Sequence, residues 1–302
     1  MYWSMYQKTR EPVEEICYST AHVTEVLSAL EKNFAGYFEN FVDFDAAKNF
    51  GQIINSAIKD FDNDRDAYKE IFDAEFLEEY EDDPNAFKSN VLKNKCPVIR
   101  KTLQSRMDEL KQYKISFRRA DANELFEKIT SICTFGREYF NRYDATTYEN
   151  VKTYYDLGME ILDEDECSLS GVVGVGIKSR ILYKLYPAVF PNENQNSIWS
   201  LYFLSGQEDF GCDYGSEFLM IDDEDSVTRQ NYSYPYQLFA YYALELYKWL
   251  ELEAAKINLP LNKNYRYVAV DAFLTSVADM HEADINFFKQ QIANGGYGHD
   301  WS

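Results

Sequence analysis

Apolar residues recur at intervals of three and four positions through most of this 302-residue chain. After Thr20, a residue type that favours the position just before a helix, this spacing continues from Val23 to Phe41. Because an α-helix turns once every ~3.6 residues, the spacing places the apolar side chains on one face, which must be buried against another element. The same pattern predicts helices over residues 45–59, 64–81, 97–110 and 268–292, and others that start at Asp121, Thr147 and Pro235.

Few segments of the chain show the alternating pattern of a β-strand. Lys114–Phe117 has a weak strand-like pattern, and Glu217–Ile221 predicts one short strand. We therefore expect a mainly α, multi-helix protein with minor β structure near 217–221. A charge run at 163–166 predicts a boundary between a helical N-terminal region (1–166) and a helical C-terminal region with a glycine-rich hairpin (167–302). The two regions form either separate domains or one continuous domain.

Acidic residues outnumber basic residues by 51 to 30, so the formal net charge is −21. A chain with this charge repels nucleic acid and anionic membranes at long range and attracts basic partners. Five cysteines at wide spacing indicate a reducing compartment rather than a disulfide framework. No apolar run approaches the ~20 residues that span a bilayer, and no secretory signal pattern is present. We expect a soluble, cytoplasmic protein with no membrane segment and no cofactor.

Charge is also segregated along the chain. Residues 60–83 contain twelve acidic and two basic residues, whereas residues 88–119 contain ten basic and two acidic residues. The two blocks either face one another across antiparallel helices or form a bipolar surface. In the second case the acidic block binds a basic protein partner. The residues expected to bind this partner are Asp62, Asp64, Asp66, Glu78, Glu79, Glu81, Asp82 and Asp83.

The most specific local pattern is Val-Gly-Val-Gly-Ile-Lys over residues 173–178. Together with the apolar residues that follow, it resembles the helix-hairpin-helix motif of DNA glycosylases. The resemblance implies that backbone N–H groups at Gly174 and Gly176 bind a DNA phosphate, which a larger side chain would obstruct. It also implies that Lys178 is a Schiff-base nucleophile at a surface turn and that Glu193 assists departure of the base. The residues that carry the resemblance are Gly174, Val175, Gly176, Lys178, Ile181 and Leu182.

Two further segments are rich in carboxylates. Asp222–Asp225 follows the predicted strand, where carboxylates can bind Mg²⁺ or Ca²⁺, and Asp279–Asp284 surrounds His281. A solvated acidic loop and a polar helix face explain these segments better than metal binding does, so we predict no metal site. The sequence therefore favours an acidic interaction protein of the inhibitor, immunity or nucleic-acid-mimicking type. The alternatives are a helix-hairpin-helix DNA-binding protein or DNA glycosylase/lyase, and a metal-dependent enzyme that uses Asp222–Asp225.

Overall fold

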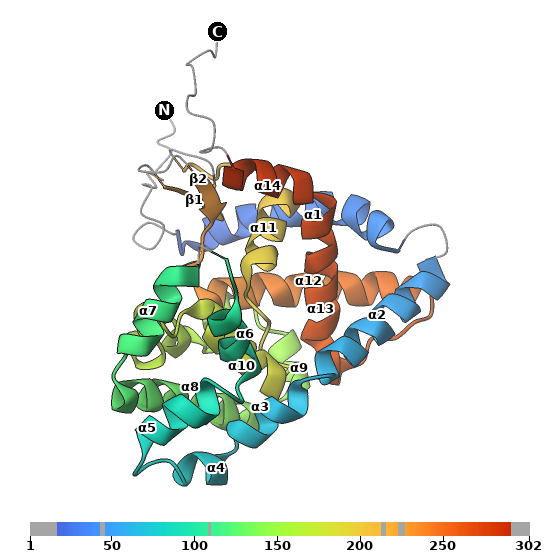
Figure 1. The fold of residues 1–302 in the computed structure, drawn as a ribbon. Helices are drawn as coiled ribbons and strands as arrows, with labels where there is room; N and C mark the ends of the chain where they lie inside the picture. Colours follow the sequence, from blue (N-terminus) through green and yellow to red (C-terminus); the bar gives the residue numbers. More distant parts are fainter. Residues whose placement is uncertain (1–16, 43–45, 108–109, 213–215, 223–226, 291–302) are drawn as a thin grey trace, which may run out of the picture. The chain divides into compact units, whose positions relative to one another are not determined.

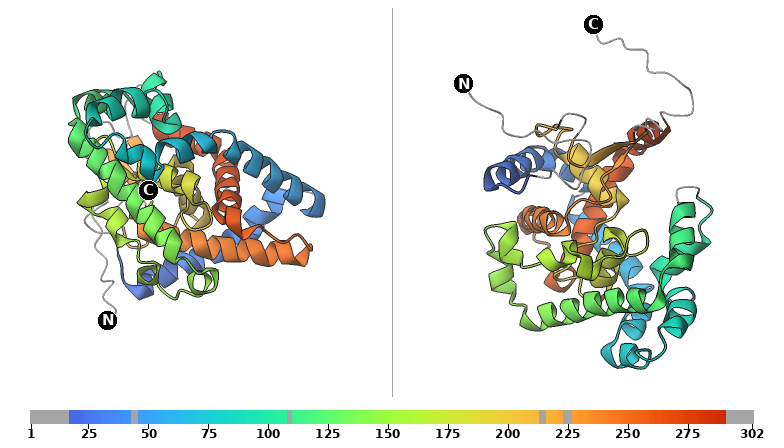
Figure 2. Two further views of the ribbon diagram at one scale, coloured as in Figure 1. Left: turned by 90° about the horizontal axis from the view of Figure 1, so that it is seen from below. Right: turned by 90° about the vertical axis from the view of Figure 1, so that its left-hand side faces the viewer.

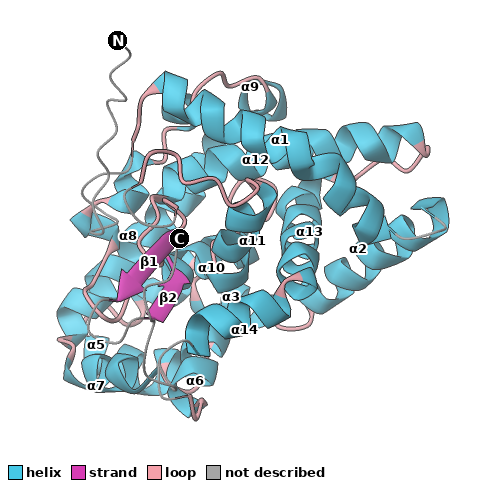
Figure 3. Cartoon of the chain, turned by 90° about the horizontal axis from the view of Figure 1, so that it is seen from above, coloured by secondary structure: helices cyan, strands magenta, loops and turns pink. Residues whose placement is uncertain are grey.

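Helices account for most of the part of the chain that the structure, a computed structural model, describes: residues 17–42, 46–107, 110–212, 216–222 and 227–290. Within these residues one small antiparallel sheet accompanies the helices (Figure 1). Figure 3, coloured by secondary structure, shows its two strands among the helices. The mainly α fold with minor β structure is confirmed.

The chain divides into two compact units that do not follow sequence order. Unit 1 combines Met1–Phe41, Gln195–Tyr234 and Leu274–Ser302, and unit 2 combines Val42–Asn194 and Pro235–Phe273. Residue 166, where the sequence predicts a boundary, lies inside unit 2. Each unit therefore brings together helices that lie far apart in the sequence.

Unit 1 is organised around the amphipathic helix predicted after Thr20. The apolar face of α1 is buried, from Val23 at 4% exposure to Phe41 at 6%, which confirms this helix. Asn33 of α1 donates a hydrogen bond of 2.9 Å from its Nδ2 to the carbonyl oxygen of Leu204. The elements of this unit are α1 (Thr20–Val42, of which Val42 belongs to unit 2), α11 (Gln195–Leu204), β1 (Leu219–Asp222), β2 (Val227–Gln230), the second half of α13 (Arg266–Met280) and α14 (Glu282–Gln290).

The sheet pairs two strands of four residues each. Leu219 lies opposite Gln230, and Asp222 lies opposite Val227. The strand predicted at 217–221 is present with shifted bounds, but the second strand was not predicted because four residues are too few to show an alternating pattern. Of the segment 222–225, only the backbone of Asp222 is among the described residues, so the suggested metal ligands lie outside the described structure.

Unit 2 contains the other helices, several of which are short. Short 3₁₀ turns over Tyr154–Leu157, Glu160–Asp163 and Asp165–Cys167 lie between α9 (Ala145–Glu149) and α10 (Val175–Leu185). The helices are α2 (Ala46–Asp62), α3 (Arg65–Ile71), α4 (Ala74–Glu78), α5 (Pro84–Ala86), a π-helical turn (Phe87–Leu92), α6 (Pro97–Gln104), α7 (Lys111–Arg119), α8 (Ala122–Arg142), α9 (Ala145–Glu149), α10 (Val175–Leu185), α12 (Tyr236–Lys256), a 3₁₀ turn (Lys263–Tyr265) and the first half of α13.

Two of the long predicted helices are interrupted. The helix expected over 64–81 is divided into α3 and α4, because the Asp73 carboxylate accepts a hydrogen bond from the Glu75 N–H and caps a new helix. The helix expected over 268–292 is divided at His281 into α13 and α14. Apolar periodicity alone did not reveal these interruptions because the apolar spacing continues across them.

The extended structure expected at Lys114–Phe117 is wrong, since this segment lies in α7. Tyr113 and Phe117 stack four residues apart with ring centroids separated by 6.3 Å, a contact that a helix allows and a strand does not. The helix expected over 97–110 ends at Gln104. After Thr147 the expected long helix is replaced by the short α9 and by 3₁₀ turns.

Helices α8 and α10 approach each other closely at Gly136. α8 is the long green helix in the right-hand view of Figure 2. A Cβ atom added to Gly136 would lie 2.5 Å from Leu182 Cδ2 and 3.1 Å from Tyr186 Cε2, both on or next to α10. A glycine at this position therefore lets α10 pack directly against the α8 backbone.

We predict that Gly136→Val will lower the free energy of unfolding by about 1–3 kcal/mol, because the added methyl groups overpack this contact. Gly36, an exposed glycine within α1, is the matched control, since no heavy atom lies within 4 Å of an added Cβ. Gly36→Ala should stabilise the protein by roughly 1 kcal/mol through its higher helix propensity. Urea unfolding of both variants tests the prediction, and a neutral Gly136→Val would contradict it.

Candidate functional site

The two glycines of the hairpin segment lie at the exposed start of α10. Gly174 is the N-cap residue, with extended backbone angles of φ −96° and ψ −175°. Gly174 and Gly176 are exposed, and no heavy atom lies within 4 Å of a Cβ built on either of them. Neither backbone strain nor internal crowding therefore requires glycine here, and the surface over the first turn of α10 is open.

Lys178 is buried, so the surface position expected for it is wrong. Its side chain is only 2% exposed, because it shares the inward face of α10 with the buried Ile181 and Leu182. The ammonium group donates hydrogen bonds to the carbonyl oxygen of Leu162 and, at 3.3 Å, to Ser168 Oγ. Burial lowers the pKa of Lys178 below its ordinary value, although nearby carboxyl groups offset part of this effect.

Glu193 is one of those carboxyl groups. It is 2% exposed, and neither of its carboxyl oxygens has a hydrogen-bond partner within the described structure. Burial raises the pKa of Glu193 well above its ordinary value; Asp163 raises it further, and Lys178 partly opposes the change. The structure therefore brings together the two residues that the resemblance names, and burial favours the protonated form of the Glu193 carboxyl group.

Asp163 is the third titratable member of this cluster, and the sequence did not identify it. It belongs to the charge run that predicts a linker, but its carboxylate caps α12 by accepting hydrogen bonds from the N–H groups of Tyr236 at 2.7 Å and Gln237 at 3.1 Å. Burial raises the pKa of Asp163, and these two donors lower it in part. No local signal reveals this role, because the capped residue lies 73 positions further along the chain.

The segment that carries Glu193 is fixed on both sides of it. Asn192 donates a hydrogen bond of 2.9 Å from Nδ2 to Asp271 Oδ1, and Asn194 donates one of 3.2 Å to the same oxygen. The Glu193 carbonyl oxygen accepts a hydrogen bond from Ser179 Oγ at 2.8 Å. These anchors explain why the Glu193 carboxyl group stays inside the protein although it lacks a partner of its own.

The cluster of Lys178, Glu193 and Asp163 has the groups that acid–base or Schiff-base chemistry requires. A lysine with a lowered pKa is a better nucleophile at neutral pH, and a carboxyl group with a raised pKa is a proton donor. Both Lys178 and Glu193 are 2% exposed. An external substrate therefore reaches them only if the residues that cover the cluster move.

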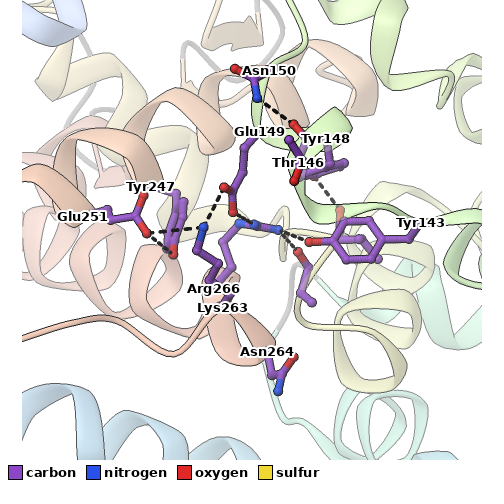
Figure 4. A network of polar contacts seen from close by, with 12 residues as sticks. Tyr143, Thr146, Tyr148, Glu149, Asn150, Tyr247, Glu251, Lys263, Asn264 and Arg266 are labelled. Atoms are coloured by element: carbon purple, nitrogen blue, oxygen red, sulfur yellow. Dashed lines mark hydrogen bonds and ion pairs between the residues drawn. The ribbon is translucent and has the colours of Figure 1, made fainter.

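A second buried polar network surrounds Arg266, the first residue of α13. The guanidinium group, 0% exposed, donates hydrogen bonds to the carboxylate of Glu149, to the carbonyl oxygen of Ala188 and, at 3.0 Å, to the Tyr143 hydroxyl (Figure 4). These partners come from the end of α9, the segment after α10 and the end of α8. Arg266 therefore joins three segments to the start of α13.

Aromatic rings and a second cation complete this network. The Cζ atom of Arg266 lies 5.0 Å from the ring centroid of Tyr148 and 4.8 Å from that of Tyr247. Lys263 also contacts Glu149, with its Nζ 2.7 Å from Oε2. Although burial alone would raise the pKa of Glu149, the hydrogen bonds from Lys263 and Arg266 hold it below its ordinary value. The chain itself compensates this buried charge.

The acidic block divides into two parts in the structure. Asp62, Asp64 and Asp66, near the start of α3, each form an ion pair. Asp64 is half-buried and lies 2.5 Å from the buried Lys184. The other part lies on α4 and the turn after it, and all six of its carboxylates are exposed. We call this part the acidic surface: Glu75, Glu78, Glu79, Glu81, Asp82 and Asp83.

The basic block does not neutralise the acidic surface. Among the described residues, the ion pairs that join the two blocks are Lys95 with Glu70 and Lys101 with Asp64, each at 3.8 Å. None of the six acidic-surface carboxylates forms an ion pair with a described residue. The two charge blocks therefore remain largely separate.

His281 lies in a packing contact within unit 1. Its Nε2 is 2.8 Å from the Tyr37 hydroxyl, its Nδ1 is 3.0 Å from Asp284 Oδ2, and its ring stacks on Phe203 with centroids 3.8 Å apart. In the part of the chain that the structure describes, no three His, Cys, Asp or Glu side chains gather in a way that could hold a metal ion. The ring nitrogens of His281 are thus used by protein groups.

None of the described helices is long and apolar enough to cross a membrane. Comparisons of the chain with protein-family models, with curated proteins and with solved structures found no match. Function must therefore be inferred from the residues and geometry of this chain.

We predict that Glu193→Gln will change how stability depends on pH. The folded-state pKa of Glu193 is raised, so its contribution to stability is complete below its ordinary value of 4.5 and is lost as the pH rises towards the raised value. Glutamine does not titrate. The variant should therefore gain stability relative to the wild type as the pH rises from about 5 to 8, by at most about 1.4 kcal/mol per pH unit. Urea unfolding across this range measures the difference, and parallel curves would contradict the prediction.

Proposed function

We propose that this protein is a cytoplasmic interaction protein that binds a basic protein partner through its acidic surface. The observation that carries the proposal is that six exposed carboxylates on α4 and the following turn lack an ion-pair partner among the described residues. Because the six lie within nine consecutive residues, they act as one strong local field for a cationic surface. An inhibitor, an immunity protein or a nucleic-acid mimic would use such a field.

Ion pairs within the chain favour some acids of the block over others as the proposed binding residues. Asp64 is held by Lys184 and Lys101, and Asp66 lies near Lys69, so these carboxylates are partly neutralised within the chain. Glu78, Glu79, Glu81 and Asp82 form no ion pair with a described residue, whereas Asp83 also caps α5 by accepting a hydrogen bond from the Ala86 N–H. We therefore centre the partner-binding site on Glu78, Glu79, Glu81, Asp82 and Asp83.

We predict that the variant Glu78→Gln/Glu79→Gln/Glu81→Gln/Asp82→Asn will bind a lysine-rich peptide at least about tenfold more weakly than the wild type, because it removes four adjacent charges. Fluorescence anisotropy at low and moderate salt measures this affinity. The salt dependence of binding should also become weaker, since fewer charges are neutralised in the complex.

The matched control carries the same net charge with four exposed acids changed elsewhere. These are Glu25, Glu31 and Glu39 of α1 and Glu127 of α8, each replaced by glutamine. The control should keep most of the wild-type affinity. Equal losses in the two variants would show that net charge alone attracts the peptide and would contradict a localised site.

A DNA glycosylase/lyase is a second candidate, and one observation favours it. Lys178 and Glu193 belong to the same buried cluster, and burial shifts the pKa of each towards the protonation state that a nucleophile and a proton donor need. Gly174 and Gly176 are exposed at the start of the same helix. This candidate requires the cluster to open.

The second candidate predicts a covalent adduct with DNA that contains an abasic site. The Lys178 amine would attack the sugar aldehyde and release water, and borohydride would reduce the resulting imine to a stable amine. Lys178→Arg should abolish the adduct while keeping the positive charge, whereas Lys152→Arg, a change at an exposed lysine, should retain it. Thermal unfolding checks that both variants fold. Absence of a wild-type adduct, or an adduct unchanged in Lys178→Arg, would exclude the lyase.

A further inference from the structure

The basic block forms an exposed, arginine-rich surface on α6, on α7 and at Arg106 between them. Residues 88–119 hold ten of the thirty lysines and arginines of the whole chain, although the net charge is −21. Six of these side chains are exposed on the two helices and their connection. We call them the basic surface: Arg100, Lys101, Arg106, Lys111, Arg118 and Arg119.

The two helices that carry the basic surface lie side by side. They are in direct contact, and the Lys114 ammonium group donates a hydrogen bond to the carbonyl oxygen of Ser105, just beyond the end of α6 (Figure 1). Lys88 contributes from the preceding turn, since its Nζ lies 2.5 Å from the carbonyl oxygen of Ala120 at the end of α7. The positive charges therefore belong to one connected part of unit 2.

Most of this charge is not compensated by the described residues. Lys101 lies 3.8 Å from Asp64, but this contact is largely exposed to water and contributes little. Arg100, Arg106, Arg118 and Arg119 form no ion pair with a described acid. Arg100 does donate a hydrogen bond of 3.4 Å to the carbonyl oxygen of Asn94. Four guanidinium groups without a described carboxylate partner, on α6, on α7 and at Arg106 between them, are more than solubility requires in a strongly acidic protein.

We propose that the basic surface binds the phosphate backbone of a nucleic acid. Four of its six residues are arginines, whose planar guanidinium groups can donate two parallel hydrogen bonds to one phosphate. The same groups can also pair with carboxylates, so the experiment below compares nucleic acid with an acidic polypeptide. Segregation of the acidic surface from the basic surface lets a polyanion approach one part of the molecule despite the unfavourable net charge.

The neighbourhood of the basic surface is compatible with this ligand. Ser116 of α7 lies against Gly171, since a Cβ added to that glycine would be 2.9 Å from Ser116 Oγ. Gly171 is three residues before Gly174, at the exposed start of α10. Arg119 is one helical turn after Ser116, so the two residues lie on the same face of α7, the face that is directed towards Gly171 and the start of α10. The proposal itself depends on the arginines and needs neither the acidic surface nor Lys178.

Binding of short duplex DNA and of single-stranded RNA, measured by fluorescence anisotropy over a series of salt concentrations, tests the proposal. For the wild type, the logarithm of the binding constant should fall linearly with the logarithm of the salt concentration, with a slope of about −0.9 per neutralised phosphate for duplex DNA. Arg118→Gln/Arg119→Gln should weaken binding about tenfold and reduce the slope by about one unit for each arginine that contacts a phosphate.

Arg142→Gln/Lys152→Gln is the matched control, because both side chains are exposed in unit 2 outside the basic surface and the change in net charge is identical. It should bind nearly as tightly as the wild type. Lys178→Arg should also keep its affinity, which separates this proposal from the lyase candidate. Absence of salt-dependent binding, or equal losses in the two double variants, would overturn the proposal. Tighter binding of polyglutamate than of nucleic acid would overturn it in favour of an acidic protein partner.

Discussion

The buried guanidinium group of Arg266 is the constraint on which much of unit 2 depends. A charge without solvent is tolerated only when a counter-charge and hydrogen-bond acceptors surround it, and here Glu149 and the Ala188 carbonyl supply both. Removing the Glu149 carboxylate would leave the charge of Arg266 uncompensated in the interior. The network therefore holds the segment after α10 in place, and that segment leads directly to Glu193.

A second set of interior contacts holds the residues on either side of Glu193. Asp271, one turn of α13 beyond Arg266 and Tyr267, accepts hydrogen bonds from Asn192 and Asn194. Glu193 is thus fixed between two anchored asparagines, next to Lys178 and Asp163. The carboxyl group remains buried because its neighbours are held, and burial in turn explains its raised pKa. The chemistry that this cluster can perform follows from packing that is distant in sequence.

The charged residues of unit 2 fall into two classes: those that are paired within the fold and those that are exposed on its surface. Asp64 and Lys184 form a pair in which the lysine is buried, and Arg65 donates hydrogen bonds to the carbonyl oxygens of Lys184 and Leu185 at the end of α10. These charges are consumed by the fold. Most charges of the acidic surface and of the basic surface have no ion-pair partner among the described residues, so their fields are available to partners of opposite sign.

Local sequence patterns by themselves determined the helical class, the amphipathic face of α1 and the positions of most helices, because these depend on spacing along the chain. They also named Lys178 and Glu193. Only the tertiary structure decided that Lys178 is buried, that Asp163 belongs with it, and that the two charge blocks stay largely separate. The reason is physical: helical spacing shows which side chains must be buried, but burial, capping and ion pairing depend on contacts between residues far apart in the chain, such as Asp163 with Tyr236 and Arg266 with Glu149.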